Sequence, residues 1–501
     1  MKSFLNGIER AGNKLPHPFI LFWLLALLVI VVSWGLSQMS LGLVNPKSGD
    51  PVVVRNLISG DGLRFMLEGL VTNFINFPPL GVIIVVMFGV GVADRVGMIG
   101  TLMQMTVVKA PAPLVTTAIA FVAICGSIAS DATYLILVPI SAMIFKSLGR
   151  NPIAGAALAY AAAGAGYNAN IFLTPTDVLL SGITTEAARA IDSNAYVSPV
   201  DNYFFMATSV LLLTVLSVVV FNWIVEPRAN TLKPENDVQE KLAVIGPQEV
   251  LGMKRVMWTS IAFIVVLLAV VLPDASPLRG EDGGLIPSPF LNGVVPILFL
   301  WFLLMGIVYG VSTGKIKKTA DVPPLIAESV KDLAPVLVLF FAISQFLAYF
   351  RWSGLGEAIA VSGSSFLTTT GFTGIPLVIA FIVLCTLLNF FITSGSAQWS
   401  LMAPIFVPML MLIGIEPAFV QAAYRIGDSA TNILSPMSPY FALTLAFMQR
   451  YKKDIGIGSL AAMMLPFSVS FLIFWTGLLV IWVAAGWPIG PGIYMMTGTG
   501  G

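Results

Sequence analysis

The sequence predicts an all-α polytopic membrane protein with about nine transmembrane helices, two re-entrant helical hairpins and an inverted-topology repeat. Of its 501 residues, 57% are hydrophobic and 10% are charged, a composition that a water-soluble chain of this length would not tolerate at its surface. The charged residues gather in short clusters between long apolar segments. Polar residues and prolines interrupt several apolar segments, which predicts broken helices at the midplane of the bilayer.

The charge balance and the rare side chains argue against several function classes. A formal net charge of +1 gives no support for a nucleic-acid partner. Cys125 and Cys385 both lie within apolar runs, which argues against a disulfide framework or a cysteine metal site. The single histidine, His17, precedes the first span. We therefore expect no catalytic histidine at membrane depth and no enzyme.

Uninterrupted apolar runs predict seven of the nine spans, and basic residues orient them. Lys2, Arg10 and Lys14 precede the first run, so the N-terminus is expected in the cytoplasm. That run is too long for the apolar part of a signal peptide, and we interpret it as a retained span. The hydrophilic segment 227–255 is expected to be a cytoplasmic loop. The seven spans are expected at residues 18–39, 79–98, 204–225, 256–272, 294–311, 333–350 and 460–485.

Two regions of paired short apolar segments predict the hairpins. Each arm is shorter than the roughly 20 residues that a helix needs to cross a bilayer, and a polar tip joins the two arms. The first hairpin, residues 109–150, has basic residues at both ends, which places both ends on the cytoplasmic side. The second hairpin, residues 376–413, has its tip at 393–399 and is expected to enter from outside.

Each hairpin is followed by an interrupted helix, and these two helices complete the nine spans. The broken helices are expected at 152–178 and 417–445. The first repeat is expected at 67–226 and the second at 294–486, within one integral membrane unit that covers residues 1–500. Because the copies enter from opposite sides, they are inverted. Paired broken elements in inverted halves indicate a secondary transporter with a site at the midplane.

The hairpin tips and helix breaks carry oxygen atoms that suit a coupling ion. Oxygen ligands favour a hard cation that must bind and leave, so Na⁺ fits better than a transition metal. We hypothesise a Na⁺ site at Asp428, Asn432, Ser394 and Ser127, with H⁺ as the alternative coupling ion and no other cofactor. The candidate ion-coupling residues are Asp428, Asn432, Ser394, Asn168, Asn170 and Ser127, with Ser130 as a further tip hydroxyl.

Arg425, Asp428 and Asn432 stand at i, i+3 and i+7 and therefore share one helix face. Ionisable groups inside a membrane are functional by default. We expect Arg425 to bind a substrate carboxylate through its bidentate fork and Asp428 to carry the coupling ion or proton. The alternative is that Arg425 and Asp428 pair with each other and only fix packing. Asp177 and Asp131 are weaker candidates, because each could lie near an interface.

Trp399, at the second hairpin tip, is a candidate to stack on an aromatic or amide group of a substrate. A tryptophan at a tip can equally be an interfacial anchor, so both interpretations stay open. Pro417, Pro436 and Pro439 are expected to shape helix ends rather than to contact a ligand.

Two motifs carry a resemblance to a known family. The run Thr-Ser-Gly-Ser-Ala-Gln-Trp from Thr393 and the run Arg-Ile-Gly-Asp-Ser-Ala-Thr-Asn-Ile-Leu-Ser-Pro-Met-Ser-Pro-Tyr from Arg425 resemble the aminobenzoyl-glutamate transporter family of the ion transporter superfamily. The resemblance implies a bowl-shaped homodimer in the inner membrane that is driven by an ion-motive force. It would place family function on Asp177, Ser396, Trp399, Pro417, Arg425, Asp428 and Pro436.

The resulting hypothesis is a multi-pass secondary transporter of the bacterial inner membrane, coupled to Na⁺ or H⁺ and elevator-like. As the resemblance implies, its substrate would be a p-aminobenzoyl-glutamate-type folate catabolite, which is a small carboxylate with an aromatic amide. One alternative is a proton-driven efflux pump that exports sulfonamide antimetabolites. An alternative of another class is an ion channel, although channels more often build one filter on an oligomer axis than two inverted hairpins.

Overall fold

The described part of the protein is built from helices, and nine of its helical segments are long and apolar enough to cross a membrane. The computed structural model describes residues 16–39, 42–46, 49–129, 132–235 and 245–496, and it contains no β-strand within these ranges. The predicted all-α polytopic class is therefore confirmed. The nine candidate spans are Pro18–Ser37, Gly60–Arg95, Ala112–Ala129, Tyr203–Ala229, Pro247–Val271, Val294–Ser312, Thr319–Trp352, Gly395–Leu412 and Ile457–Ala484.

Seven of these segments overlap the seven uninterrupted spans that the sequence predicts. The other two, Ala112–Ala129 and Gly395–Leu412, are arms of the predicted hairpins. The two predicted broken helices are instead each divided into two shorter helices. The predicted and observed numbers of spans are both nine, but two of the nine segments differ. Length and hydropathy alone do not distinguish a hairpin arm from a membrane span.

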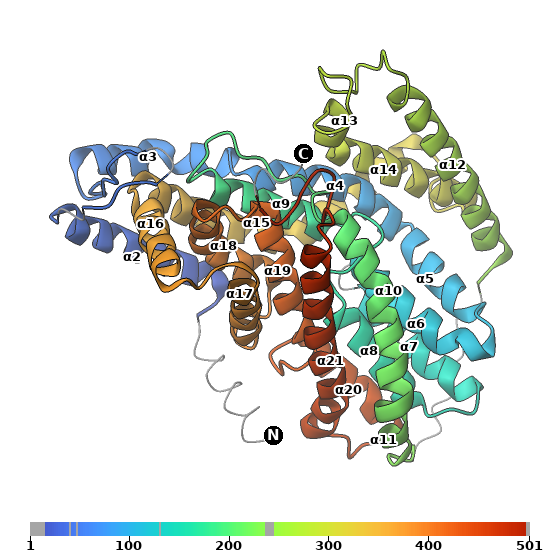
Figure 1. The fold of residues 1–501 in the computed structure, drawn as a ribbon. Coiled ribbons are helices and arrows are strands. Elements are labelled where there is room, and N and C mark those ends of the chain that lie inside the picture. The colour runs from blue at the N-terminus through green and yellow to red at the C-terminus, as the bar shows by residue number, and fades with distance from the viewer. Residues whose placement is uncertain (1–15, 40–41, 47–48, 130–131, 236–244, 497–501) are drawn as a thin grey trace.

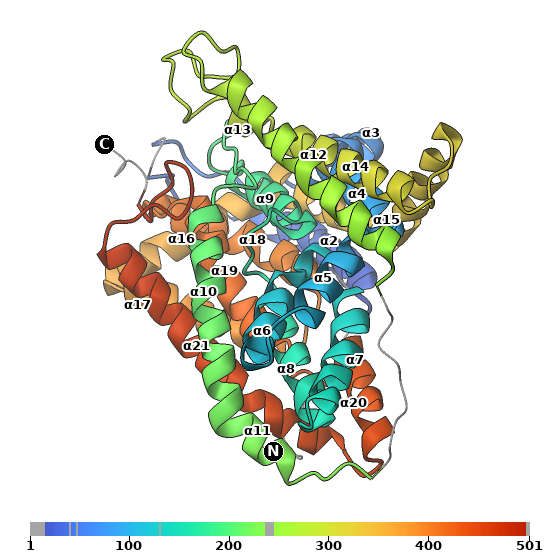
Figure 2. The ribbon, with the colours of Figure 1, turned by 90° about the vertical axis from the view of Figure 1, so that its right-hand side faces the viewer.

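One group of helices, here called the slanted layer, packs around α4 and α15. Helix α4 contacts α14 and α15, α15 contacts α2 and α3, and α12 contacts α14. Figure 2 shows the slanted helix α12 together with α14, α4 and α15 at the upper right, away from α10 and α21 at the left. The layer consists of α2 (Pro18–Ser37), α3 (Gly60–Ile75), α4 (Pro78–Arg95), α12 (Pro247–Val271), α14 (Val294–Ser312) and α15 (Val322–Trp352).

The second group, here called the core bundle, contains both predicted hairpins and both broken helices. Helix α8 contacts α6 and α7, α19 contacts α17 and α21, and α9 contacts both α18 and α4 of the slanted layer. The bundle consists of α6 (Val115–Ile124), α7 (Ala132–Ser147), α8 (Pro152–Ala165), α9 (Pro175–Ala188), α10 (Tyr203–Val220), α17 (Gly374–Asn389), α18 (Gly395–Leu412), α19 (Pro417–Ala430), α20 (Pro439–Tyr451) and α21 (Ile457–Ala484).

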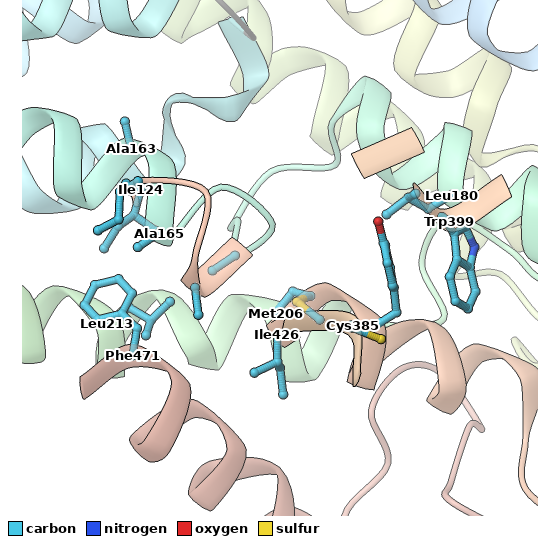
Figure 3. Packing of buried hydrophobic residues seen from close by; sticks show 14 of the residues in the cluster. Ile124, Ala163, Ala165, Leu180, Met206, Leu213, Cys385, Trp399, Ile426 and Phe471 are labelled. Atoms are coloured by element: carbon cyan, nitrogen blue, oxygen red, sulfur yellow. The ribbon is translucent and has the colours of Figure 1, made fainter. Parts of the chain in front are cut away.

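Helices α8 and α19 form the centre of the core bundle. Every residue of both helices is buried, and in α8 the many alanine and glycine residues allow close approach of neighbouring helices. Helices α10 and α21 run side by side next to this centre (Figure 1). Figure 3 shows Leu213 of α10 beside Phe471 of α21, and both side chains are fully buried.

Short elements complete the described chain. They are α5 (Met98–Val108), α11 (Glu226–Asn230), α13 (Pro289–Asn292), α16 (Leu355–Thr370), the 3₁₀ turns η1 (Ala112–Leu114), η2 (Cys125–Ala129) and η4 (Thr319–Asp321), and the π-helical turn η3 (Phe221–Val225). Helix α16 contacts α18 and α15, and α5 contacts α4, α6 and α7, so both short helices bridge the slanted layer and the core bundle.

The first broken helix is longer than predicted. The prediction ended it at residue 178, but its second half begins at Pro175 and continues to Ala188. Thr174 caps this half, because its Oγ1 accepts a hydrogen bond from the Asp177 amide at 3.3 Å while the Asp177 Oδ2 accepts one from the Thr174 amide at 2.7 Å. A capping box followed by proline at the first helical position is a start signal, and the prediction was wrong to take it as an end.

Three other predicted boundaries also move. The second broken helix extends past residue 445, because α20 ends at Tyr451. Residues 395–399 of the predicted hairpin tip are helical, since Ser394 caps α18. The segment 227–255 is only partly a loop, because α12 begins at Pro247. Five residues named in the predictions, Lys2, Arg10, Lys14, Ser130 and Asp131, lie outside the described residues.

Candidate functional site

A cavity of about 880 Å³ lies between the slanted layer and the core bundle. One wall comes from α4 and α15, and it is mainly apolar apart from Asp94, Arg95 and Asp332. The other wall comes from the ends of the interrupted bundle helices. Of the residues that the sequence singled out, the cavity lining contains Asn168, Ser394, Ser396, Asp428, Asn432 and Pro439.

Asn168 lies where the first broken helix is interrupted, and it ties that break to α19. Its Nδ2 donates to Asp428 Oδ2 at 2.8 Å and to Ser429 Oγ at 2.7 Å, and its amide donates to Ser429 Oγ at 3.3 Å. Asn168 and Asp428 are 260 residues apart in sequence. The predicted ion-coupling residues Asn168 and Asp428 are therefore in direct contact.

The Asp428 carboxylate lies against the first turn of α18. A Cβ atom placed on Gly395 would stand 2.8 Å from Asp428 Oδ2, so a side chain at this position would force the carboxylate or the helix to shift. The Tyr424 hydroxyl is near the carboxylate, but it donates to the Gly395 carbonyl at 2.6 Å. Asp428 Oδ1 and Asn168 Oδ1 are both buried and accept no hydrogen bond of good geometry from the described residues.

Asn389, at the end of α17, organises the other side of α19. Its Nδ2 donates to the Asp428 carbonyl at 2.5 Å, to Thr431 Oγ1 at 3.0 Å and to Asn432 Oδ1 at 3.1 Å. Asn389, Ser429 and Thr431 were not predicted from the sequence. A single asparagine at the end of an apolar hairpin arm was the signal that could have identified the first of them, because a polar side chain there needs hydrogen-bond partners.

The Arg425 guanidinium is buried and forms an ion pair with Asp177. Arg425 Nη1 lies 2.5 Å from Asp177 Oδ1, and the two side chains are 1% and 8% exposed. Asp177 Oδ2 accepts from the Thr174 amide and hydroxyl at 2.7 and 2.8 Å. Arg425 therefore forms an ion pair as the alternative expected, but its partner is Asp177 and not Asp428. Arg425 and Asp177 are not among the described residues that line the cavity.

Trp399 is fully buried inside the protein, which excludes the alternative of an interfacial anchor. Its Nε1 donates to Thr184 Oγ1 of α9 at 3.0 Å, and its ring stacks on Tyr424 at a centroid distance of 4.4 Å. In Figure 3 the indole lies beside Leu180, another α9 residue. Trp399 thus connects α18 to α9 and α19 behind the cavity wall, and it is not in the described lining.

The remaining predicted residues are not among the described residues that line the cavity. Asn170 Nδ2 donates to Ser127 Oγ at 2.5 Å and to the Cys125 carbonyl at 3.4 Å, so these two candidates contact each other at the first hairpin tip. Pro417 is the first residue of α19, and Pro436 lies between α19 and α20. Within the described ranges, no group of three or more His, Cys, Asp or Glu side chains could hold a metal ion.

A charged pair at the cavity was not foreseen from the sequence. Arg95, the last residue of α4, forms an ion pair with Asp332 of α15, and Asp94 lies beside them in the lining. The predicted span begins at residue 333, one residue after Asp332. Because α15 is continuous from Val322 to Trp352, Asp332 is instead held against α4.

Comparisons with known proteins identify relatives over nearly the whole chain. A model of the AbgT transporter family matches residues 3–497. The p-aminobenzoyl-glutamate transport protein of Escherichia coli (strain K12) is 41% identical over 488 residues, which is 97% of this chain and 96% of that protein.

Two solved structures resemble the whole fold. The YdaH transporter of Alcanivorax borkumensis superposes with a TM-score of 0.91 at 38% identity, covering 95% of this chain and 100% of that one. MtrF of Neisseria gonorrhoeae, whose structure illuminates a class of antimetabolite efflux pumps, also has a TM-score of 0.91, at 40% identity, covering 98% and 100%.

Proposed function

Since this chain belongs to the AbgT transporter family, we propose that it is a secondary transporter that carries p-aminobenzoyl-glutamate across the bacterial inner membrane. It is a membrane transporter and not an enzyme. The observation that carries the proposal is the 880 Å³ cavity whose polar wall is made by the interruptions of both broken helices and by the second hairpin tip. The name of the relative from Escherichia coli supplies the substrate.

The glutamate part of this substrate carries two carboxylates, and the N-terminus of α18 at the cavity suits them. Its cap Ser394 and its first residues Gly395 and Ser396 belong to the cavity lining. The amides and the helix dipole at such an end favour negative charge. Ser394 and Ser396 add hydroxyl donors, so we assign the carboxylates to this wall.

Arg425, Asp177, Trp399, Pro417 and Pro436 remain in the proposed substrate site in a less direct role. Arg425 reaches a carboxylate only after its ion pair with Asp177 opens, because both side chains now lie behind the lining. Trp399 holds α18 against α9 through Thr184. The two prolines set the ends of the helices that carry the polar residues.

We assign ion coupling to Asp428 with Asn168, Asn432 and Ser394. The chemistry of the donor set fits Na⁺, because Asp428 Oδ1 and Asn168 Oδ1 are buried acceptor oxygens that the described residues leave unsatisfied and hard cations take oxygen ligands. A proton on Asp428 is the alternative. Ser127 and Asn170 contact each other, so their proposed part is to hold the first hairpin tip near this site.

The finer architecture is also part of the proposal. We infer that α6–α7 and α17–α18 are re-entrant hairpins of an inverted repeat, with repeat limits at 67–226 and 294–486, in a single unit. The N-terminus is assigned to the cytoplasm. The core bundle is assigned to move against the slanted layer in an elevator-like cycle, and the slanted layer is assigned to the interface of a homodimer.

A second candidate function is the proton-driven export of sulfonamide antimetabolites. The 40% identity to MtrF, whose structure illuminates a class of antimetabolite efflux pumps, favours it specifically. Both candidates use the same cavity and differ in direction and coupling ion.

The test is the transport of radiolabelled p-aminobenzoyl-glutamate and a sulfonamide in proteoliposomes with Na⁺ and pH gradients imposed separately. We expect saturable p-aminobenzoyl-glutamate flux that follows one ion gradient. An Asp428→Asn variant should still exchange substrate but should no longer accumulate it. Sulfonamide extrusion that follows only the pH gradient would support the second candidate, and flux that never saturates would contradict both.

A further inference from the structure

A stacked pair of tyrosines forms part of the cavity wall outside the polar cluster. Tyr134, at the start of α7, and Tyr440, at the start of α20, stack with ring centroids 4.2 Å apart and ring planes at 9°. Both residues belong to the cavity lining. Tyr134 is buried, whereas Tyr440 is partly exposed, so the pair presents part of a ring to the cavity.

Further aromatic packing supports the pair, and one of the supporting residues, Tyr160, also belongs to the cavity lining. The ring of Tyr134 also contacts that of Tyr160 on α8 at 6.1 Å, and Tyr160 contacts Phe441 at 6.3 Å. The four rings come from α7, α8 and α20, and Tyr134 and Tyr160 are both almost fully buried. Such support fixes the plane of the Tyr440 ring before any ligand arrives, which lowers the entropy cost of binding against it.

The cavity lining therefore combines two kinds of chemistry. It contains the polar groups of Asn168, Asp428 and the Ser394–Ser396 turn, and it also contains the tyrosine pair. Helices α4 and α15 add the apolar side chains Ile83, Met87, Val90, Leu333 and Val336. A ligand that carries both carboxylates and an aromatic ring matches this combination, since aromatic rings favour stacked or edge contacts with other rings.

We propose that Tyr440, supported by Tyr134, is a binding subsite for the aromatic ring of the substrate. The proposal rests on the proposed function, because it assigns part of the lining of the same cavity to the aminobenzoyl group. It makes the tyrosine pair a determinant of specificity, so that the transporter selects an aroyl-glutamate over glutamate derivatives without a ring. The ring subsite acts through Tyr440 in direct contact with the substrate, and Tyr134 positions Tyr440.

The test compares two ligands that share the amide and both carboxylates. p-Aminobenzoyl-glutamate has the aromatic ring and N-acetyl-glutamate lacks it. Their affinities are measured by competition against radiolabelled p-aminobenzoyl-glutamate on the purified full-length protein. Tyr440→Leu should weaken p-aminobenzoyl-glutamate about tenfold, the loss expected for one ring contact of about 1.4 kcal/mol, and should leave N-acetyl-glutamate within about twofold. Tyr440→Phe keeps the ring and should retain both affinities.

A matched control removes a ring pair that does not line the described cavity. Phe381 and Phe406 pack at 5.1 Å between α17 and α18, and Phe406→Leu should change neither affinity. If Tyr440→Leu fails to fold, Tyr440→Met replaces it. Equal losses for both ligands in the Tyr440 variants would reduce the pair to a packing role, and no loss for either would also overturn the subsite. A wild-type protein that binds no p-aminobenzoyl-glutamate would instead overturn the proposed function itself.

Discussion

At the scale of single residues, buried charged side chains determine which substitutions destabilise this protein most. Arg425 and Asp177 form an ion pair inside the core bundle at 1% and 8% exposure. Removing one member of such a pair leaves an uncompensated charge at low dielectric, which costs far more than the pair itself contributes. The same two residues were predicted from their cost in an apolar environment, whereas their pairing was not.

We predict that Asp177→Asn lowers the unfolding free energy by about 3–5 kcal/mol, because it leaves the Arg425 guanidinium buried without a counter-charge. Asparagine keeps an acceptor oxygen for the Thr174 amide, so the helix cap is retained. The matched control is Asp61→Asn, which breaks an exposed pair with Arg64 and should cost less than about 1 kcal/mol. Thermal unfolding in detergent measures both, and equal shifts would contradict the prediction.

Asp201, between α9 and α10, should make stability depend on pH. Burial raises the pKa of its carboxyl to about 7, the Ser198 amide opposes this rise, and the nearby Glu416 charge adds to it. A folded pKa above the unfolded value of 3.8 means that the folded state binds more protons between about pH 4 and pH 7. Stability from this group is therefore complete below pH 4 and is lost as the pH rises through 7.

At pH 8 we expect the unfolding free energy of Asp201→Asn to exceed that of the wild type by an amount on the order of 1 kcal/mol. Between pH 5 and pH 8 the melting temperature of this variant should change little. The exposed Asp192 lies on the same connection, and Asp192→Asn serves as the control that changes the charge equally. Thermal melting curves of the wild type and both variants at pH 5 and pH 8 test this prediction. An unchanged pH slope in Asp201→Asn would remove Asp201 from this role.

At the scale of elements, helix starts build the site. The sequence Thr174-Pro175-x-Asp177 begins α9, Ser394 caps α18, and Pro439 is the first residue of α20. Each start follows an interruption that leaves polar groups at the cavity. The prediction identified these interruptions because polar residues within apolar runs are costly. At α9 the prediction was wrong about the direction, because it took the start of a helix as the end of one.

We predict that Gly395→Ala reduces p-aminobenzoyl-glutamate transport about tenfold, since overpacking costs about 1–3 kcal/mol and the new Cβ would meet the Asp428 carboxylate at 2.8 Å. Gly81→Ala is the matched control, because a Cβ on that α4 residue meets nothing within 4 Å. Transport at wild-type rates in Gly395→Ala, with normal expression, would show that the close approach of α18 to Asp428 is dispensable.

At the scale of the whole molecule, the cavity lies between two groups of helices, and few ion pairs among the described residues connect them. Arg351 of α15 and Glu186 of α9 form one such contact, with Arg351 Nη1 2.7 Å from Glu186 Oε1. It connects the slanted layer to the core bundle. If the core bundle moves against the slanted layer, this ion pair must break during each cycle.

A cross-link between the two groups should therefore abolish transport. We expect a cysteine pair at Arg351 and Glu186, joined by a bifunctional maleimide, to bind substrate without moving it. The control pair, at Ser260 and Trp301, joins α12 to α14 within the slanted layer, where the indole Nε1 lies 2.9 Å from the hydroxyl, and should transport normally. Undiminished flux in the first cross-linked protein would exclude relative movement of the two groups at this contact.

By itself, the sequence determined the membrane class, the long apolar spans and five of the polar residues at the cavity, Asn168, Ser394, Ser396, Asp428 and Asn432. It could do so because hydrocarbon makes every polar group expensive, so each one is conspicuous. Only the tertiary structure decided that Arg425 pairs with Asp177, that Asn389 supports Asn432 and that Trp399 lies behind the lining. These partners stand tens to hundreds of residues apart, and no local pattern of spacing encodes which helix faces meet when the bundle packs.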